Sequence, residues 1–513
     1  MKKIFPLLVA ASVLGMSCAN SLQRERFSPH DAIRSVKKEE AFLKTHMKSG
    51  SLYVFSSWAS DTAAKTISGE ATLYDINRNS IHSGMITIGT DSIAIAETNH
   101  LDVSPSTTMI SIMTVASLGV TIYCQANPKA CFGSCPTFYV QSGDSLQLRA
   151  EGFSSSVAPS LEVADADALL EGSPQSRDYV LTMKNEALET HVVRHADILA
   201  VSKNGSARIF KNTRGEFLRC GIPQSPLQAS NAGGSDCTAL LKAMDGHERF
   251  STTDSADLAE REEIEVEFLK APATQAGIVI GARQTLLSTY LFYQTLAYLG
   301  TGAGEWFARL ENDKTGFLKS QIRRAELHLG GIDVLAQNSA GEWESIGEIY
   351  EHGPLASDTH ILPLPKWAQN SQKFRIRVAK GNWRIDYVAR AEIHGEAEVD
   401  RVQPLSVFKN NQPVPAALAQ LTDPLQTLVT LPGDNFDIHY KLPENFADCE
   451  IFLESKGYYI EWMRQEWLTE ENPALALEIF TAPKKALKRL APKFKALEHT
   501  MEESFWRSRY AGR

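Results

Sequence analysis

The chain lacks the features that mark most familiar functional classes. Its 61 acidic residues outnumber its 52 basic ones, for a formal net charge of −9 over 513 residues, so no basic excess is available to attract nucleic acid. It contains no Gly-x-Ser-x-Gly, His-Glu-x-x-His or P-loop motif, the local signatures of serine hydrolases, zinc proteases and nucleotide-binding enzymes. The catalytic residues therefore stay unknown, neither a cofactor nor a metal is expected, and a non-enzymatic role is favoured.

Long hydrophobic runs are also missing. The most suggestive segment, 103–128, has no charged residue, but its apolar centre covers only 109–123 and is interrupted by serine and threonine. A membrane-spanning helix needs about 20 predominantly apolar residues. We expect a buried helix or hairpin-like insertion here, with membrane contact as the alternative.

The N-terminus is typical of an exported protein. Lys2 and Lys3 precede an apolar stretch and a run of small residues that ends at Cys18, which is the architecture of a secretory signal over 1–17. The cysteine after Gly15-Met16-Ser17 resembles the bacterial lipobox, although Gly15 stands where leucine is usual. We expect Cys18 to be lipidated and the chain to be anchored to a bacterial membrane outside the cytoplasm, with plain secretion as the alternative.

Six further cysteines follow Cys18. Three of them crowd the segment IYCQANPKACFGSCPTFYV, which has neither the paired short spacings of a structural zinc site nor the Cys-x-x-Cys of a redox centre. In an exported chain an even number of cysteines favours disulfide bonds. Proximity in the sequence suggests the pairs Cys131–Cys135 and Cys220–Cys237. Cys124–Cys449 is then the pair that remains.

Hydrophobic periodicity predicts a multidomain α+β chain. It comprises a β-rich N-terminal body, a central buried helix, a β-sandwich-like (jelly-roll-like) unit and a helical C-terminal region. The central helix is expected within 284–304, ending at Gly300. Apolar residues at spacings of three and four form a helical stripe from 487 to 505, broken or bent at Pro492. The expected segments are a signal peptide (1–17), a tether with a short helix (18–50), a β-rich domain (51–215), a loop-rich and helical connector (216–320), the sandwich-like unit (321–396) and the mainly helical region (397–513).

Two patterns could carry chemistry. His191 and His195 would share a metal on a helix, but THVVRHADILAV has the pattern of a strand, on which residues four apart lie about 13 Å apart. Carboxylates accompany aromatic residues in 448–467, as in a sugar-binding cleft. We expect that segment to be helical, and two of its carboxylates, Glu454 and Glu461, would then lie on one helix face without flanking a common bond.

The cysteine segment also carries a family resemblance. CFGSCPTFYV followed by GDSLQLRAEG resembles the CFGxCP opening of uncharacterised bacterial envelope lipoproteins. Further along, ALETHVVRHADILAV, RQTLLSTYLFYQTLAYLG and FLESKGYYIEWMRQEWL extend the resemblance over most of the chain. It implies an envelope location and assigns no activity.

These observations favour a lipid-anchored or secreted binding or structural protein of the bacterial envelope, partnered by the membrane and by an envelope protein or glycan, and not by nucleic acid. The alternative is a hydrolase acting on envelope glycan or peptide. Acidic side chains converging on a cleft from the 330–396 unit and the C-terminal helices would favour the hydrolase, whereas a closed, packed interface there would favour the structural module. The basic amphipathic C-terminal segment is expected to dock on the protein's own body, with anionic lipid headgroups as the alternative.

Overall fold

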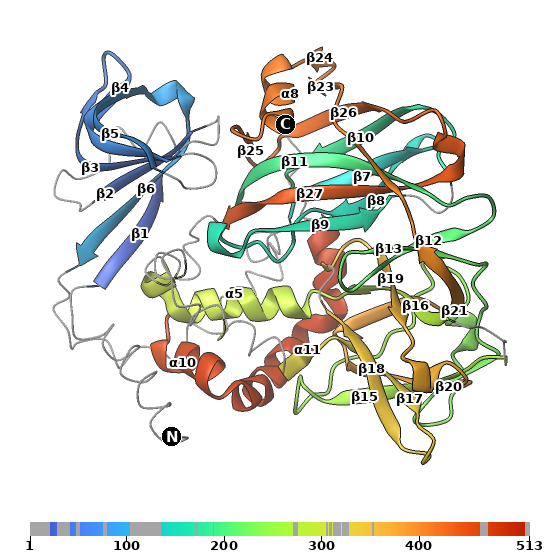
Figure 1. Ribbon diagram of the computed structural model, residues 1–513. Helices are drawn as coiled ribbons and strands as arrows, with labels where there is room; N and C mark the ends of the chain where they lie inside the picture. Colours follow the sequence, from blue (N-terminus) through green and yellow to red (C-terminus); the bar gives the residue numbers. More distant parts are fainter. Residues whose placement is uncertain are drawn as a thin grey trace.

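A computed structural model of the chain describes residues 21–27, 42–47, 52–74, 80–102, 135–169, 173–187, 189–269, 275–303, 306, 310, 320, 328–350, 353–461 and 470–507. Five groups of hydrogen-bonded strands make up most of this part of the chain (Figure 1). The protein is a multidomain α+β chain with a sandwich-like, β-rich body, as its periodicity predicts.

The N-terminal unit is a six-stranded antiparallel sheet around a small apolar core. Its strands, in spatial order, are β1 (Ser21–Phe27), β6 (Ile93–Asp102), β2 (Phe42–Met47), β3 (Leu52–Asp61), β4 (Thr66–Tyr74) and β5 (Ser80–Gly89). Figure 1 shows this sheet in blue, set to one side of the other β layers.

Two of these strands correct the tether and short helix expected over 18–50. In β2 the side chains of Leu43, Thr45 and Met47 are buried, the period of two that marks a strand. Alternation over so few residues was too short to be recognised. The polar β1 pairs with β6 along its full length through backbone hydrogen bonds, which do not depend on apolar side chains.

The second unit is a sandwich of two sheets. One sheet has the order β24 (Gln412–Pro413), β23 (Ser406–Lys409), β26 (Asn435–Lys441), β10 (Asp178–Lys184), β7 (Thr137–Ser142) and β8 (Ser145–Glu151). The other has the order β22 (Val399–Val402), β11 (Glu189–Ser202), β27 (Cys449–Glu461) and β9 (Val163–Ala168), with β25 (Leu428–Thr430) also paired to β11. Their facing side chains form one apolar core that includes Phe138, Ile198 and Leu453.

Strand β27 corrects the helix expected at the start of the C-terminal region. It pairs with β11 from Glu189↔Glu461 to Ser202↔Cys449. Leu453 packs into the sandwich core, and its neighbour Phe452 packs on the opposite face against β12 and β13. A strand buried on both faces has no polar alternation, so its periodicity does not separate it from a buried helix.

Gly457 lets β27 approach β11 closely. A Cβ atom there would lie 2.3 Å from the Val192 carbonyl oxygen and 2.9 Å from the Phe153 ring. We therefore expect Gly457→Ala to lower the free energy of unfolding by about 1–3 kcal/mol, measured by urea denaturation. Gly302→Ala is the control, since no atom lies within 4 Å of the added Cβ. An equal effect of the two substitutions would refute the steric account.

The third unit packs a closed barrel on a sheet. The barrel strands are β12 (Arg208–Asn212), β13 (Phe217–Cys220), β21 (Trp383–Glu396), β16 (Ala276–Gln284) and β19 (Asp358–Pro363). The sheet has the order β14 (Gln228–Asn231), β15 (Arg261–Glu267), β20 (Lys373–Ala379), β17 (Ile332–Gln337) and β18 (Trp343–Ile349). Both layers contribute to a common core, so this unit is sandwich-like with one layer closed on itself.

The third unit uses more of the chain than the segment 321–396 that periodicity indicated. Strands β13 to β16 come from 217–284, within the segment 216–320 expected to be a connector, whereas β12 comes from the end of the segment expected to be β-rich. Within 321–396 the run FRIRVAK alternates as a strand does, and its apolar residues Phe374, Ile376 and Val378 are buried in the core. Strands such as β14 and β15 could not be predicted locally, because the sheet that they form continues into strands more than a hundred residues away. Val266 of β15, for example, pairs with Ala229 of β14 on one side and with Phe374 of β20 on the other.

Helices form a separate apolar cluster beside the β units. These are α5 (Leu287–Leu299), α10 (Pro473–Thr481) and α11 (Pro483–Arg507), while α8 (Pro415–Thr422) packs on the second unit. The predicted central helix is confirmed as α5, which ends at Gly300 with φ 51°. The predicted stripe of α11 is buried at Leu487, Leu490, Phe494, Leu497, Met501 and Phe505.

Docking of the C-terminal segment on the body is confirmed, since the α11 stripe shares one core with α5. Pro492 lies inside α11, which continues as one helix from Pro483 to Arg507, so of the break or bend expected at Pro492 the break does not occur. Among the described residues no helix is long and apolar enough to cross a membrane. The uncharged segment 103–128 lies outside the described residues.

Candidate functional site: a polar cavity between the second and third units

A cavity of about 670 Å³ opens where β8, β9 and β27 of the second unit meet the barrel of the third. The loop after the short helix η3 (Thr238–Leu241) closes one side, and 355–357 lead into β19 along another. Its charged lining residues are Arg149, Arg208, Arg283, Asp245, Glu248, Asp386 and Glu450. Charges of both signs in a concave site of this size are typical of a site for a polar ligand.

Asp386 is placed in this cavity by a β-bulge. In the pairing of β16 with β21, Gly281 pairs with Tyr387 and Ala282 pairs with Ile385, so Asp386 is the extra residue on β21. Bulges redirect a side chain and occur often beside functional sites. Here the bulge places a carboxylate that is 4% exposed in the wall of a polar cavity.

The two carboxylate oxygens of Asp386 differ in their partners. Oδ2 accepts a 3.1 Å hydrogen bond from the backbone N–H of Gly246, whose φ of 81° favours glycine. Oδ1 is buried and has no hydrogen-bond partner among the described residues. Burial raises the pKa of Asp386, partly offset by the Gly246 N–H. A buried oxygen without a partner is costly, which makes Asp386 a candidate acceptor for a ligand donor.

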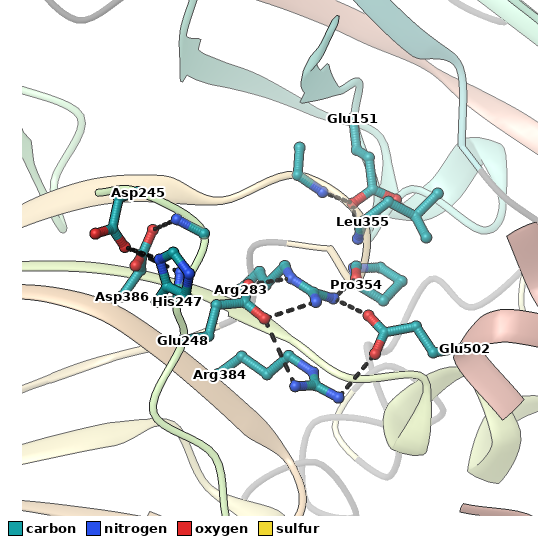
Figure 2. A network of polar contacts seen from close by, with 12 residues as sticks. Glu151, Asp245, His247, Glu248, Arg283, Pro354, Leu355, Arg384, Asp386 and Glu502 are labelled. Atoms are coloured by element: carbon teal, nitrogen blue, oxygen red, sulfur yellow. Dashed lines mark hydrogen bonds and ion pairs between the residues drawn. The ribbon is translucent and has the colours of Figure 1, made fainter. Parts of the chain in front are cut away.

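Asp245 lies on the same loop in a more exposed setting, beside His247 (Figure 2). Its Oδ1 accepts a 3.0 Å hydrogen bond from the His247 backbone N–H and lies 3.1 Å from the His247 Nδ1. The backbone N–H of His247 lowers the pKa of Asp245. The cavity therefore carries two aspartates whose pKa values are shifted in opposite directions.

Glu248 belongs to a box of four charges at the edge of the cavity (Figure 2). Arg283 Nη2 lies 2.8 Å from Glu248 Oε2, and Arg283 Nη1 lies 2.5 Å from Glu502 Oε1 of α11. Arg384 closes the box at 2.8 Å from Glu502 Oε2 and 3.6 Å from Glu248 Oε2. Burial works to lower the pKa of Arg283, but the bonds to Glu248 and Glu502 outweigh it and raise that pKa.

This box shows how acidic side chains of the C-terminal helices meet the third unit. Glu502 does approach the third unit, but both arginines engage it and it does not line the cavity. The contact between α11 and the barrel is thus a paired interface. The polar cavity lies beside it and takes its lining carboxylates from the loop after η3, from β21 and from β27.

Glu151 is buried beside this cavity, where β8 ends. Its Oε2 accepts hydrogen bonds from the backbone N–H groups of Leu355 at 2.5 Å and Ala356 at 2.9 Å, two residues that line the polar cavity. Glu151 itself borders a second, mainly apolar cavity of about 620 Å³ against α5, α10 and α11. Burial raises the pKa of Glu151 to about 7, although both N–H groups and Arg283 lower it in part.

The carboxylate of Glu450 on β27 forms an ion pair with an arginine. Arg208 Nε donates a 2.7 Å hydrogen bond to its Oε1. Burial raises the pKa of Glu450, and Arg208 partly offsets the rise. Arg149, across the cavity on β8, bonds Gln147 through Nη2 and has a buried Nε without a hydrogen-bond partner among the described residues. Donors as well as acceptors therefore face the cavity.

The residues that the sequence singled out lie elsewhere. His191 and His195 stand on β11, as predicted, where His191 is fully buried beside Glu189 and His195 bonds Glu454 at 3.1 Å. The bonds from His195 and Arg401 lower the pKa of Glu454 to about 2. Glu454 and Glu461 share the strand β27 and not a helix face. Within the described ranges, no three His, Cys, Asp or Glu side chains form a metal site.

The cysteines do not form the predicted Cys220–Cys237 bond. Both are free thiols: Cys220 is buried in the apolar cluster of the barrel, while Cys237 packs against the core between barrel and sheet. Residues close in sequence thus lie in two different cores. Cys449 is also a free thiol, and its proposed partner Cys124 lies outside the described residues. So does Cys131, the proposed partner of the buried Cys135, and so do Cys18 and the signal segment 1–17.

Sequence reasoning missed Asp386, Asp245 and Glu151. Asp386 lies in the run WRIDYVARAEI, whose alternating apolar residues are typical of a regular strand. The odd-numbered Trp383 and Ile385 face one core, whereas Tyr387 and Ala389 face the barrel cluster. The change of face identifies the bulge, but it cannot be seen in the sequence because both faces of β21 bury apolar residues.

Comparisons with known proteins leave the family open. No family model and no curated protein matches the chain. Among solved structures, the alignment with an allantoicase covers 54% of this chain and 98% of the allantoicase chain, with a TM-score of 0.18 and 8% identity. A β-porphyranase of glycoside hydrolase family 86 from Bacteroides plebeius covers 46% of this chain and 37% of its own, with a TM-score of 0.15 and 7% identity. Likenesses this weak carry no argument about function.

Proposed function

We propose that this chain is a lipid-anchored binding protein of the bacterial cell envelope, related to the uncharacterised lipoproteins that its cysteine segment resembles, and that the polar cavity holds its ligand. The observation that carries the binding role is Asp386, a residue of the cavity lining whose buried Oδ1 has no hydrogen-bond partner among the described residues. The location outside the cytoplasm rests on the signal-like segment 1–17 and on Cys18.

The ligand that fits this lining best is an envelope glycan fragment. Carboxylate oxygens accept hydrogen bonds from sugar hydroxyls, and Arg149 offers donors. Phe210, Tyr387 and Phe452 add aromatic surface to the same cavity, against which the apolar face of a sugar ring can pack. The volume of about 670 Å³ lies within the range of small-molecule sites, roughly 300–1,000 Å³.

The ligand can be tested by calorimetry with soluble peptidoglycan and lipopolysaccharide-core oligosaccharides. We expect the full chain to bind at least one, and Asp386→Asn to weaken that binding about 10- to 100-fold, the value of a hydrogen bond to a charged group. The amide oxygen of the introduced asparagine can still accept the Gly246 N–H, so the fold should survive. Asp178→Asn is the control, because Asp178 is exposed on β10 and its carboxylate pairs only with Lys441 among the described residues. Equal affinities of the Asp386 variant and the control would contradict the assignment.

The anchor is tested separately. Expression of the full chain in a bacterium with a labelled fatty acid should label the wild type, and Cys18→Ser should abolish both the label and retention in the membrane fraction. A Cys18→Ser protein that stays in the membrane fraction would rule out the lipid anchor, whatever the cavity binds.

A second candidate is hydrolysis of the same class of ligand. Burial raises the pKa of Asp386 while the His247 N–H lowers that of Asp245, and a pair of carboxyls shifted apart is what an acid and a base require. Incubation of each bound oligosaccharide with the protein, followed by chromatography, separates the two roles. Intact ligand indicates binding alone; cleavage that Asp386→Asn abolishes would establish the hydrolase.

A further inference from the structure

A second group of charged side chains lies mostly buried between the second and third units. Lys211 on β12 meets Asp358 on β19, together with Asp165 and Asp167 on β9. The side chains of Lys211 and Asp358 are 8% and 3% exposed, and Asp167 is 4% exposed. Charged residues this deeply buried are rare without a specific reason.

The backbone fixes Lys211 and Asp358 against each other. Strands β12 and β19 are parallel neighbours, and Lys211 pairs with His360, two residues beyond Asp358 and on the same face. Lys211 Nζ lies 3.1 Å from Asp358 Oδ2 and also donates to the Ala166 carbonyl oxygen. Asp358 Oδ1 accepts a 3.3 Å hydrogen bond from the Ala168 N–H. Both partners are therefore held in place before any reaction.

The cluster faces away from the polar cavity. Phe210, Ala168 and Thr359 line that cavity, whereas Lys211, Asp167 and Asp358, their immediate neighbours along the strands, do not. Successive side chains of a strand point to opposite faces. An external substrate has no access from that side, so chemistry in this cluster would take place between its own side chains.

The charges in the cluster do not balance when every group is ionised. Lys211 and His360, whose Nδ1 lies 3.5 Å from Asp358 Oδ2, face three carboxylates. Even with both nitrogens protonated the cluster would carry an excess negative charge, which burial disfavours. Burial, reinforced by Asp165 and Asp358, holds the pKa of Asp167 well above its usual range. Asp167 Oδ2 is buried without a hydrogen-bond partner among the described residues. Burial therefore favours the neutral acid form of Asp167, which shares its face of β9 with Asp165, whose Oδ1 lies 4.0 Å from Lys211 Nζ.

We propose that Lys211 and Asp358 become joined by an intramolecular amide bond between Nζ and Cγ, with Asp167 as the acid that moves protons during its formation. This inference does not depend on the proposed ligand. Two groups fixed at contact distance react as if at very high concentration, and a dry interior favours a neutral amide over a buried ion pair.

The reaction balances without a further reactant. Burial acts to lower the pKa of Lys211, but the surrounding carboxylates raise it, so the resting amine is charged. One proton must first pass from Nζ to Asp358, which leaves a neutral amine and a neutral acid. The nitrogen lone pair then forms the bond to Cγ, Asp167 gives its proton to the departing hydroxyl, and the C–O bond breaks. Asp167 regains a proton from the nitrogen, and one water molecule leaves, for which the partly exposed Asp165 offers an exit.

Intact mass spectrometry of the purified, folded full chain tests this proposal. The wild-type protein should be lighter than its sequence mass by one water, after allowance for processing at the N-terminus. Tandem spectra should show one branched peptide that joins the segments around residues 211 and 358. Lys211→Met should restore the full mass, and the matched variant Lys409→Met, which removes another lysine paired with an aspartate, should keep the loss.

The wild-type measurement decides the matter even if the variants fold poorly. Wild-type protein at its full mass, or a water loss that persists in Lys211→Met, would overturn the cross-link. Asp167→Asn is expected to leave both residues unlinked, and a completed bond in that variant would overturn the role given to Asp167.

Discussion

Arg283→Met is expected to lower the free energy of unfolding by about 3–5 kcal/mol, the cost of removing one partner from a buried ion network. Arg283 is 13% exposed and bonds Glu248 of the loop after η3, Glu502 of α11 and the Pro354 carbonyl oxygen. Methionine has similar bulk but no charge, so two carboxylates would remain with Arg384 as their shared partner. The barrel would then hold the loop and the C-terminal helix at this point through Arg384 alone.

The matched control is Arg375→Met on β20. Arg375 also bridges two glutamates, Glu263 and Glu265, but these are 34% and 50% exposed, and exposed pairs contribute about 0–1 kcal/mol. Urea denaturation of both variants measures the difference. Similar midpoints for Arg283→Met and Arg375→Met would show that the buried box adds no stability beyond that of a surface pair.

Glu151→Gln is expected to raise stability in a pH-dependent way. The pKa of Glu151 is raised from 4.5 to about 7 in the folded state, so ionisation favours unfolding. The contribution of Glu151 to stability is complete below pH 4.5 and is lost as pH rises through about 7. A shift of this size corresponds to about 3 kcal/mol. Glutamine can still accept the Leu355 and Ala356 N–H groups and carries no charge to desolvate.

We therefore expect wild type and Glu151→Gln to have similar unfolding free energies near pH 4.5 and to diverge up to about pH 8, with the variant more stable by up to about 3 kcal/mol. Urea midpoints across this range measure the divergence. Glu342→Gln, at an exposed turn between β17 and β18, is the control and should leave the wild-type curve unchanged. A constant offset between Glu151→Gln and wild type would mean that Glu151 does not titrate in this range.

The pattern of apolar residues predicted those helices and strands that bury only one face. The alternation of Phe374, Ile376 and Val378 identified β20, and the stripe from Leu487 to Phe505 identified α11, because each buries a single face. The pairing of β11 with β27, and the barrel contact of β12 with β19, join segments far apart in sequence. Their strands are buried on both faces or are short, and their assembly could not be predicted from periodicity.

The candidate site could not be predicted because it depends on that assembly. Asp386 becomes a cavity residue through a bulge, and Asp245 joins it because the loop after η3 runs beside β21. The residues that the sequence singled out for chemistry are His191, His195 and Glu454. They form histidine–carboxylate hydrogen bonds within the second unit, His191 with Glu189 and His195 with Glu454. Polar residues in a strand acquire their role from the elements packed against them.

The central claim is that the polar cavity between the second and third units holds an envelope glycan. A crystal structure of the full chain with the oligosaccharide selected by calorimetry tests it most directly. We predict ligand density in this cavity, with a sugar hydroxyl within hydrogen-bond distance of Asp386 Oδ1. A ligand bound elsewhere on the molecule, with the cavity unchanged, would contradict the account.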